Sequence, residues 1–464
     1  MCGINGIISK SKNQELISDT LKKMNSLIFH RGPDEDGFCI DNHLDTTVGM
    51  AMRRLSIIDL STGKQPIYND DKSIVIVFNG EIYNYRALKK QLESEGITFK
   101  TKSDTEVILK LYETKGENSF SSLDGMFAFS IYDKNKNKVF ITRDFFGEKP
   151  LYYYQTETEF YWASELKSII KNLNYKPEIS KTGLNLYFKL TYTPAPYTMY
   201  KNIYKLEANH YIAFDLSEND FSIQPINTIA HEKQDISFDD AKIKLHDLMM
   251  ESIESRSISD VPLGTFLSGG VDSSIVSLGL SQFSNQKIDT FSIGFDKASF
   301  DETDKSKLVA KRIQSNHHEF IISEKDLEKH IHEILVNFDE PFADSSALPT
   351  FMVAKKTRDF VKVALTGDGG DEVFIAANLF PLGGVEVAED EGIDAEDAGK
   401  SAYDQKLDEY PDGSPVPDGL PNAYRLSEND KLCSNCSYYE KGQCTRFNAA
   451  VKAKYVCNAW KANE

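Results

Sequence analysis

The sequence predicts two consecutive domains of different fold class: an α+β domain rich in strands, followed by an α/β domain with a parallel sheet. In the first 170 residues, short apolar runs separated by tight turns predominate, which favours sheets with a few helices. After residue 236, strands alternate with helices, which is typical of a parallel sheet. With 464 residues, 40% of them hydrophobic, the chain is long enough for two to four domains with substantial cores.

Composition narrows the class of partner. The formal net charge of −18 argues against binding to nucleic acid or to a membrane surface, because both require basic patches. No charged and apolar leader opens the chain, and the longest apolar stretch, Ser73–Phe78, has the length of a buried strand. The six cysteines are not spread as a disulfide framework would be. We therefore expect a cytoplasmic protein.

The first residues suggest a nucleophile. If Met1 is removed, Cys2 carries a thiol and a free α-amine on the same residue, and the amine can take the proton of the thiol without a histidine. The two groups titrate close together, at roughly 8 for the amine and about 8.5 for the thiol. The alternative is that a cysteine at position 2 is chance. A strand at residues 4–8 and a helix at 14–28 follow, the latter from apolar residues at helical spacing.

Four polar side chains stand beside the next predicted elements. Arg54 precedes a predicted strand, and a buried arginine there needs a carboxylate from the protein or from a ligand. The predicted strand 74–78 runs into Asn79 and Gly80, whose amide and N–H suit an oxyanion hole. Glu81 suits the ammonium of an amino acid, and Asp104 either caps the helix that starts there or binds a ligand. Further predicted elements are a helix at 85–95 and strands at 127–132, 139–142 and 151–154.

Seven motifs in this part of the chain identify a family resemblance. They are MCGINGI, HRGPD, RLSIID, NGEIYN, SDTEV, DGMFAF and RDFFGEKPLYY, in that order. The motifs resemble the glutaminase domain of class II glutamine amidotransferases, in the branch of glutamine-hydrolysing asparagine synthetases, over residues 1 to about 170. The resemblance implies an Ntn-hydrolase fold of two stacked antiparallel sheets flanked by helices, which we assign to residues 1–190.

The same resemblance implies roles for individual residues. Cys2 matches the nucleophile that attacks the side-chain amide of glutamine, and Asn79 and Gly80 match the oxyanion hole. Arg54 matches the arginine that pairs with the α-carboxylate of glutamine. Glu81 and Asp104 match the groups that hold its α-ammonium, and Ile57 belongs to the same glutamine-binding set.

A second motif opens the α/β domain. After a connecting region at 191–235 and an amphipathic helix at 236–257, a strand at 261–267 leads into the turn Ser268-Gly-Gly-Val-Asp-Ser-Ser274 and a helix. Backbone N–H groups at such a helix start bind phosphate, and Asp272 is a natural ligand for a bridging Mg²⁺. The ending of a Walker A motif is missing. Strands at 288–295, 318–322 and 361–365 and a helix at 301–314 continue the fold.

This turn resembles the pyrophosphate loop of the ATP-pyrophosphatase (PP-loop) family, and residues 339–348 and 366–372 again resemble the asparagine synthetases. The resemblance assigns residues 236–374 to this domain and implies that Asp368 is an acidic residue near the activated acceptor. It also implies that Asp371, with Asp272, positions Mg²⁺. The ATP-binding residues that it implies are Leu267, Ser268, Gly269, Gly270, Asp272, Ser273, Ile293, Thr366 and Gly367.

After residue 374 the motifs of the family stop, and we find no counterpart of its helical segment or of the lysine it carries. Residues 375–431 are acidic and rich in Gly, Pro and Ser, which predicts a linker. Residues 432–464 hold four cysteines spaced C-x₂-C-x₇-C-x₁₂-C, which suit Zn²⁺ or a 4Fe–4S cluster, free thiols or disulfides being the alternative. This piece weakly resembles a high-potential iron–sulfur protein. The four candidate ligands are Cys433, Cys436, Cys444 and Cys457.

Two hypotheses about function follow. In the first, the protein is a glutamine-dependent asparagine synthetase whose substrates are glutamine, ATP and aspartate, or a related amidotransferase for another carboxylate. In the second, it is a glutaminase with a nucleotide-binding domain that never completes the transfer. The resemblance also implies a homodimer.

Overall fold

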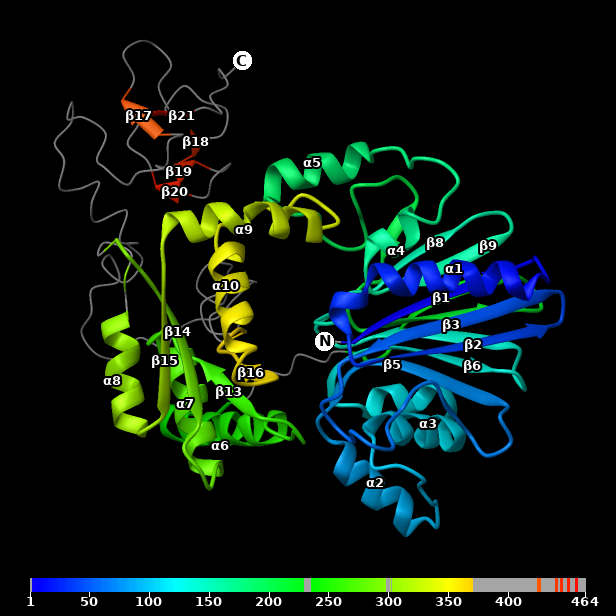
Figure 1. The fold of residues 1–464 in the computed structure, drawn as a ribbon, viewed down its shortest axis with the longest axis horizontal. Coiled ribbons are helices and arrows are strands. Elements are labelled where there is room, and N and C mark those ends of the chain that lie inside the picture. The colour runs from blue at the N-terminus through cyan, green and yellow to red at the C-terminus, as the bar shows by residue number, and fades with distance from the viewer. Residues whose placement is uncertain are drawn as a thin grey trace. The chain divides into compact units, whose positions relative to one another are not determined.

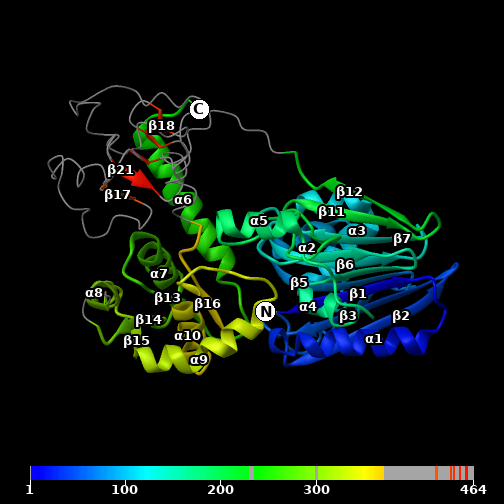
Figure 2. The ribbon, with the colours of Figure 1, turned by 90° about the horizontal axis from the view of Figure 1, so that it is seen from above.

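The computed structural model describes residues 2–228, 235–297, 301 and 303–369, and short strands at 424–426, 439–440, 443–444, 449–450 and 455–457. By its internal contacts the chain divides into two units, Met1–Ala376 and Ala377–Glu464. The first unit contains both predicted domains. Figures 1 and 2 show it as a pair of stacked sheets followed by a separate parallel sheet with its helices.

The front domain is built on two antiparallel sheets, as expected. The first sheet has the order β10 (Ile203–Lys205), β8 (Tyr152–Gln155), β9 (Glu159–Ala163), β1 (Gly3–Ser9), β3 (Thr46–Arg54) and β2 (Glu35–His43). The second has the order β12 (Asp220–Pro225), β11 (His210–Asp215), β7 (Lys138–Arg143), β6 (Gly125–Asp133), β5 (Ile74–Ile82) and β4 (Ile67–Tyr68). The segment 191–235, expected to connect the domains, therefore supplies strands to both sheets.

Helices cover the outer faces of the sheets, which gives four layers (Figure 1). One core lies between the sheets and includes Ile4, Met50, Val77 and Trp162. Separate apolar clusters lie under α1 on the first sheet and under α3 on the second. The helical segments are α1 (Gln14–Leu27), η1 (Phe29–Arg31), α2 (Tyr85–Ser94), α3 (Asp104–Lys115), η2 (Gly116–Ser122), α4 (Leu166–Ile170) and α5 (Lys181–Leu190).

The predicted strand at 4–8 and helix at 14–28 are confirmed, but the strand predicted after Arg54 is wrong. Arg54 is the last residue of β3, and the following residues form a loop. Strands β2 and β3 are not predicted from the sequence, because Asp, Asn, Thr and Gly interrupt their apolar residues. Strand β5 also continues past the predicted end at residue 78, through Asn79 and Gly80 to Ile82.

The second domain has a parallel sheet in the order β15 (Asn316–Ile322), β14 (Asp289–Phe295), β13 (Leu263–Phe266) and β16 (Val363–Leu365). The loop after β13 leads directly into a helix, as the sequence predicts. The helices of this domain are α6 (Phe238–Arg256), α7 (Val271–Phe283), α8 (Thr303–Ile313), α9 (Glu324–Asn337) and α10 (Ala347–Thr357).

Helix α6 forms where it is predicted, but its apolar face is not buried as an amphipathic pattern implies. Ile253 is buried against Leu280 of α7, whereas Ile243 and Leu248 are 62% and 54% exposed. The helical spacing therefore predicted the position of the helix correctly, but fewer of its apolar side chains are buried than the spacing predicts.

Beyond residue 369 the structure describes the strands β17 (Tyr424–Leu426), β18 (Tyr439–Glu440), β19 (Gln443–Cys444), β20 (Ala449–Ala450) and β21 (Tyr455–Cys457). Cys433, Cys436, Asp371 and most of the predicted linker 375–431 lie outside the described residues. The zinc or iron–sulfur module thus stays a prediction. In the described part of the chain, no group of three or more His, Cys, Asp or Glu side chains is placed to hold a metal, and no helix is long and apolar enough to cross a membrane.

The close approach of β1 to Trp162 gives a test of the packing. Gly6 faces Trp162 across the strand pair, and a Cβ at Gly6 would lie 1.9 Å from the indole ring. The ring has no room to retreat, because Trp162 is fully buried and its Nε1 donates to Ser130 Oγ at 2.6 Å. We expect Gly6→Ala to lower the free energy of unfolding by about 1–3 kcal/mol, measured by denaturant unfolding followed by circular dichroism. Ser26→Ala on the exposed face of α1 is the control, and equal stability of the two variants would contradict this packing.

Candidate active site

A cavity of about 310 Å³ lies at the predicted nucleophile. All residues that the sequence assigned to glutamine line it, although they come from the residue before β1, two strands, a loop and a helix start. They are Cys2, Arg54, Ile57, Asn79, Gly80, Glu81 and Asp104.

Cys2 directly precedes β1, and its contacts fix both its side chain and its backbone. The N–H of Leu55 lies 3.3 Å from the sulfur, and the thiol lies 3.6 Å from the carbonyl of the same residue. The guanidinium of Arg31 donates from Nε to the Cys2 carbonyl at 2.8 Å. Burial raises the pKa of the Cys2 thiol, and the Leu55 hydrogen bond opposes that rise. The thiol therefore needs a nearby base to become a nucleophile.

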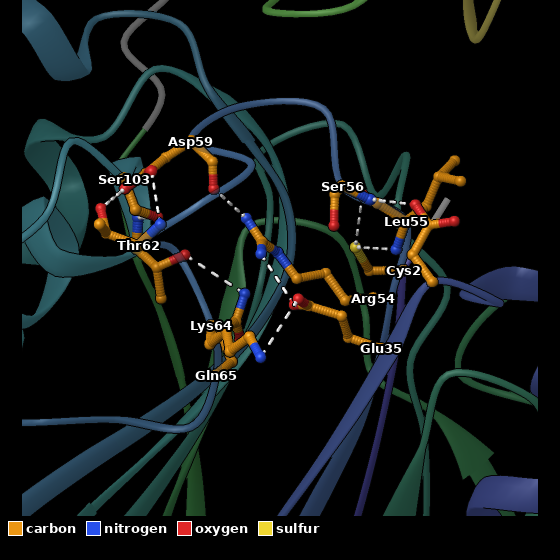
Figure 3. A network of polar contacts seen from close by, with 12 residues as sticks. Cys2, Glu35, Arg54, Leu55, Ser56, Asp59, Thr62, Lys64, Gln65 and Ser103 are labelled. Atoms are coloured by element: carbon orange, nitrogen blue, oxygen red, sulfur yellow. Dashed lines mark hydrogen bonds and ion pairs between the residues drawn. The ribbon is translucent and has the colours of Figure 1, made fainter.

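Arg54 finds its carboxylate within the protein. Its Nη1 donates to Glu35 Oε2 at 2.9 Å, and its Nη2 donates to the carbonyls of Ile58 and Asp59 at 2.9 and 2.8 Å (Figure 3). The side chain is buried, so these bonds hold the loop 55–59 firmly. A ligand carboxylate at Arg54 would have to displace Glu35 or use the remaining N–H groups of the guanidinium. No sequence motif indicated a role for Glu35.

The amide of Asn79 is the clearest sign of a ligand. Asn79 is fully buried in the middle of β5, and neither atom of its side-chain amide has a hydrogen-bond partner among the described residues. Leaving a buried polar group unpaired costs about 1–3 kcal/mol, so a molecule in the cavity that accepts and donates hydrogen bonds would recover that energy. Next to it, Gly80 lacks a side chain because a Cβ there would lie 2.1 Å from the Met126 carbonyl.

Two buried carboxylates give the cavity its charge. Burial raises the pKa of Glu81 to about 7, and the neighbouring Asp104 raises it too. Burial also raises the pKa of Asp104 to about 6, while N–H groups of Ile82 and Thr105 donate to its carboxylate and oppose this rise. Ser103 Oγ accepts from the Thr105 N–H as the N-cap of α3, so Asp104 itself is available to the cavity. A pair of carboxylates in this position favours a cation.

The loop 55–59 that forms one wall is also bound to the start of β13. The N–H of Asp59 donates to Asp260 Oδ2 at 2.8 Å, and the Asp260 N–H donates to the Ile57 carbonyl at 3.1 Å. Asp260 stands three residues before β13, whose far end carries the serine–glycine loop.

A second contact joins the same loop to the start of β16. Lys362 Nζ donates to Asp34 Oδ2 at 2.9 Å, and the same oxygen accepts the Ser56 N–H at 2.9 Å. Although burial acts to raise it, these donors hold the pKa of Asp34 below its usual range. Lys362, Val363 and Ala364 also line the cavity, which sequence reasoning missed because they lie some 300 residues from the other lining residues.

Sequence reasoning also missed Lys149. This residue stands inside the motif RDFFGEKPLYY, which supplied the resemblance but no role for the lysine. Its side chain is buried and lines the cavity with Met126. A charged residue inside a recognised motif, directly before a proline turn, was the available signal.

The serine–glycine turn has the geometry of an anion site. Gly269 has a φ of +86°, and a Cβ on it would lie 2.6 Å from the Ser306 N. The hydroxyl of Ser268 accepts from the Gly270 N–H at 3.2 Å and lies 2.9 Å from Ser273 Oγ. The turn ends at the N-terminus of α7, whose first turn holds Asp272. The turn thus brings three serine hydroxyls to the start of α7, where the phosphate-binding hypothesis places its ligand.

The other predicted nucleotide-binding residues surround this turn. Gly367 packs on it so closely that a Cβ would lie 2.7 Å from the Ser273 N, which places Thr366 and Asp368 beside the loop. Thr366 Oγ1 donates to Asp368 Oδ2 at 2.8 Å. Leu267 is fully buried and donates its N–H to the Phe291 carbonyl on β14, the strand that also carries Ile293.

Comparison with known proteins agrees with both domains. A glutamine amidotransferase domain matches residues 1–225, and an asparagine synthase domain matches residues 244–407, beyond the point where the motifs stop. A putative glutamine-hydrolysing asparagine synthetase 2 of Methanocaldococcus jannaschii is 42% identical over 401 residues, which cover 81% of this chain and 75% of that protein. Glutamine-hydrolysing asparagine synthetases 1 and 2 of Bacillus subtilis are 38% and 36% identical and cover 82% and 80% of this chain.

The chain spans only 59% and 52% of the length of the two Bacillus proteins. The similarity nevertheless extends over both domains and over most of the Methanocaldococcus protein. The chain belongs to the family of glutamine-hydrolysing asparagine synthetases.

Proposed function

We propose that the protein makes asparagine from aspartate, with ammonia taken from glutamine and energy from ATP. The buried, unpartnered amide of Asn79 beside Cys2 carries the proposal, because it is placed to bind an oxygen that becomes negative during attack on an amide. The carboxylates of Glu81 and Asp104 in the same cavity suit the α-ammonium of an amino acid.

In the first half-reaction, the Cys2 thiol attacks the side-chain carbonyl of glutamine after Met1 has been removed. The free α-amine of Cys2 accepts the thiol proton, which compensates for the raised pKa of the buried thiol. The oxyanion is bound by the Asn79 amide and the Gly80 N–H. The amide nitrogen leaves as ammonia with the transferred proton, and water then hydrolyses the thioester to glutamate.

In the second half-reaction, the aspartate β-carboxylate attacks the α-phosphorus of ATP and displaces pyrophosphate. The loop Ser268–Ser274 binds the departing pyrophosphate through backbone N–H and hydroxyl groups. Mg²⁺ fits this site, because the Asp272 carboxylate would otherwise repel the phosphates, and the ion would neutralise their charge. Ammonia then attacks the acyl carbon, and AMP leaves.

We further propose that ammonia stays inside the protein between the two reactions. Lys362, Val363 and Ala364 line the glutamine cavity, and β16 leads from them to Thr366–Asp368 beside the nucleotide loop. Water would protonate free ammonia and hydrolyse the adenylate, so a route through the protein protects both.

Removal of the thiol tests the two-site scheme. We expect Cys2→Ala to abolish glutamine-dependent asparagine formation while ammonium chloride still supports synthesis at the wild-type rate, because the nucleotide site is untouched. Asparagine, glutamate and pyrophosphate are measured with glutamine, ATP, Mg²⁺ and aspartate present. Loss of both activities would contradict the scheme. Glutamate formation without aspartate-dependent pyrophosphate in the wild type would identify a glutaminase that does not transfer, and pyrophosphate release with another acid would identify a different acceptor.

Removal of the carboxylate in the serine–glycine loop tests the second site. We expect Asp272→Ala to lower pyrophosphate release at least about a hundredfold, since the phosphates lose the metal that neutralises them. Glutamate production should remain, because Asp272 does not line the glutamine cavity. Asp296→Ala, at the end of a neighbouring strand, is the control. Unchanged ATP cleavage in Asp272→Ala would remove the Mg²⁺ role from this residue.

A further inference from the structure

The loop that carries Lys149 is held by a single buried carboxylate. Asp144 has no exposed surface, and its oxygens accept the N–H groups of Phe146, Glu148 and Lys149 at 2.9–3.1 Å. From the other side, Arg143 Nε donates to the Lys149 carbonyl at 2.8 Å. The backbone of Lys149 is therefore fixed, and its side chain projects from a rigid base.

The lysine side chain ends at Met126, the cross-strand partner of Glu81. Lys149 is 3% exposed, and its Nζ lies 2.9 Å from the sulfur of Met126. Met126 and Glu81 are direct partners in the antiparallel pair of β6 and β5, so their side chains lie on the same face of the sheet. Both Lys149 and Glu81 line the glutamine cavity. The lysine ammonium is thereby placed among the groups that receive the substrate.

The ammonium of Lys149 offsets part of the negative charge of the carboxylates around it. Glu81 faces Asp104 and Lys149, and Lys149 in turn faces Glu81, Glu148, Arg31 and Asp144. Two carboxylates in one buried cavity repel each other, and one of them then binds a proton near neutral pH. A protonated carboxyl group is a poor partner for an ammonium. A lysine ammonium beside the pair opposes this protonation and favours the carboxylate that an α-ammonium can bind.

We propose that Lys149 is a positioning residue for glutamine: its ammonium favours the carboxylate form of Glu81, which receives the α-ammonium of the substrate. The assignment rests on the proposed function and adds to it a source of selectivity for an amino acid with a free α-ammonium. The attraction between Lys149 and Glu81 affects the pKa of both groups. Burial raises the pKa of Glu81 to about 7 and lowers that of Lys149, and each charge opposes the shift of the other.

The test is the pH dependence of glutamine binding to the full chain carrying Cys2→Ser, which neither consumes the ligand nor titrates as a thiol. Binding is measured by calorimetry from about pH 6 to about pH 9, in two buffers so that released protons are counted. Without the lysine, the pKa of Glu81 rises, and binding is lost at a higher pH. We expect Lys149→Met to move the midpoint up by about one pH unit. Binding should be weaker by about fivefold at pH 7, less than about twofold weaker at pH 9, and accompanied by greater proton release.

Two variants serve as controls, and a third is a substitute for the test variant. Lys149→Arg keeps the charge and should keep the midpoint. Lys110→Met removes another buried lysine, which pairs with Asp70 and Glu113 away from the cavity, and should change nothing. Lys149→Gln replaces Lys149→Met if the latter does not fold by circular dichroism.

The outcomes separate this assignment from the proposed function. A Cys2→Ser chain that binds no glutamine at any pH overturns both. Glutamine binding that weakens equally at every pH in Lys149→Met, or does not weaken, overturns only the role of Lys149, because loss of packing alone would not move the midpoint. In the wild-type cavity, binding near pH 7 should release a fraction of a proton, and absence of that proton would also overturn it.

Discussion

The arrangement of the cavity depends on the buried guanidinium of Arg54. It joins three separate pieces: its own strand β3, Glu35 at the start of β2, and the carbonyls of Ile58 and Asp59. The loop that it shapes includes Leu55, which contacts the thiol, and Ile57, which forms the wall. A charge buried this deeply is stable only with such partners, and breaking a buried pair costs about 3–5 kcal/mol. The same bonds that stabilise the arginine thereby hold the nucleophile in place.

The cavity combines rigid walls with unsatisfied polar groups. Strands β5 and β6 approach closely because Gly80 has no side chain, while the loop at Asp144 is fixed by its internal hydrogen bonds. Inside these walls, the amide of Asn79 lacks a partner, and Glu81 and Asp104 bind protons more tightly than exposed carboxylates do. A ligand that forms hydrogen bonds and ion pairs with these groups would recover the free energy that their burial costs.

The clustering of Cys2, Arg54, Asn79, Glu81 and Asp104 around one cavity was predictable because these residues stand in long motifs. The two stacked sheets and the parallel sheet also followed from the sequence. Strands β2 and β3 did not, since their polar residues hide the alternation. Glu35 and Lys362 were missed because charge pairing between segments separated in sequence leaves no local pattern. Neither the apolar exposure of Ile243 and Leu248 nor the closure of the cavity by β16 is encoded in residue spacing.

Lys362, Val363 and Ala364 of the second domain line the cavity of the front domain, so the front domain alone cannot form the complete cavity. The front domain ends its sheets at Pro225, so a gene fragment stopping there would encode every side chain assigned to glutamine yet leave their chamber without part of its enclosure. Recombination that pairs this front half with a different partner must therefore supply a new closing strand of matching charge, to meet Asp34 and the backbone of Ser56. Because the second domain completes the wall of this cavity, inheritance of the two domains as one unit is favoured.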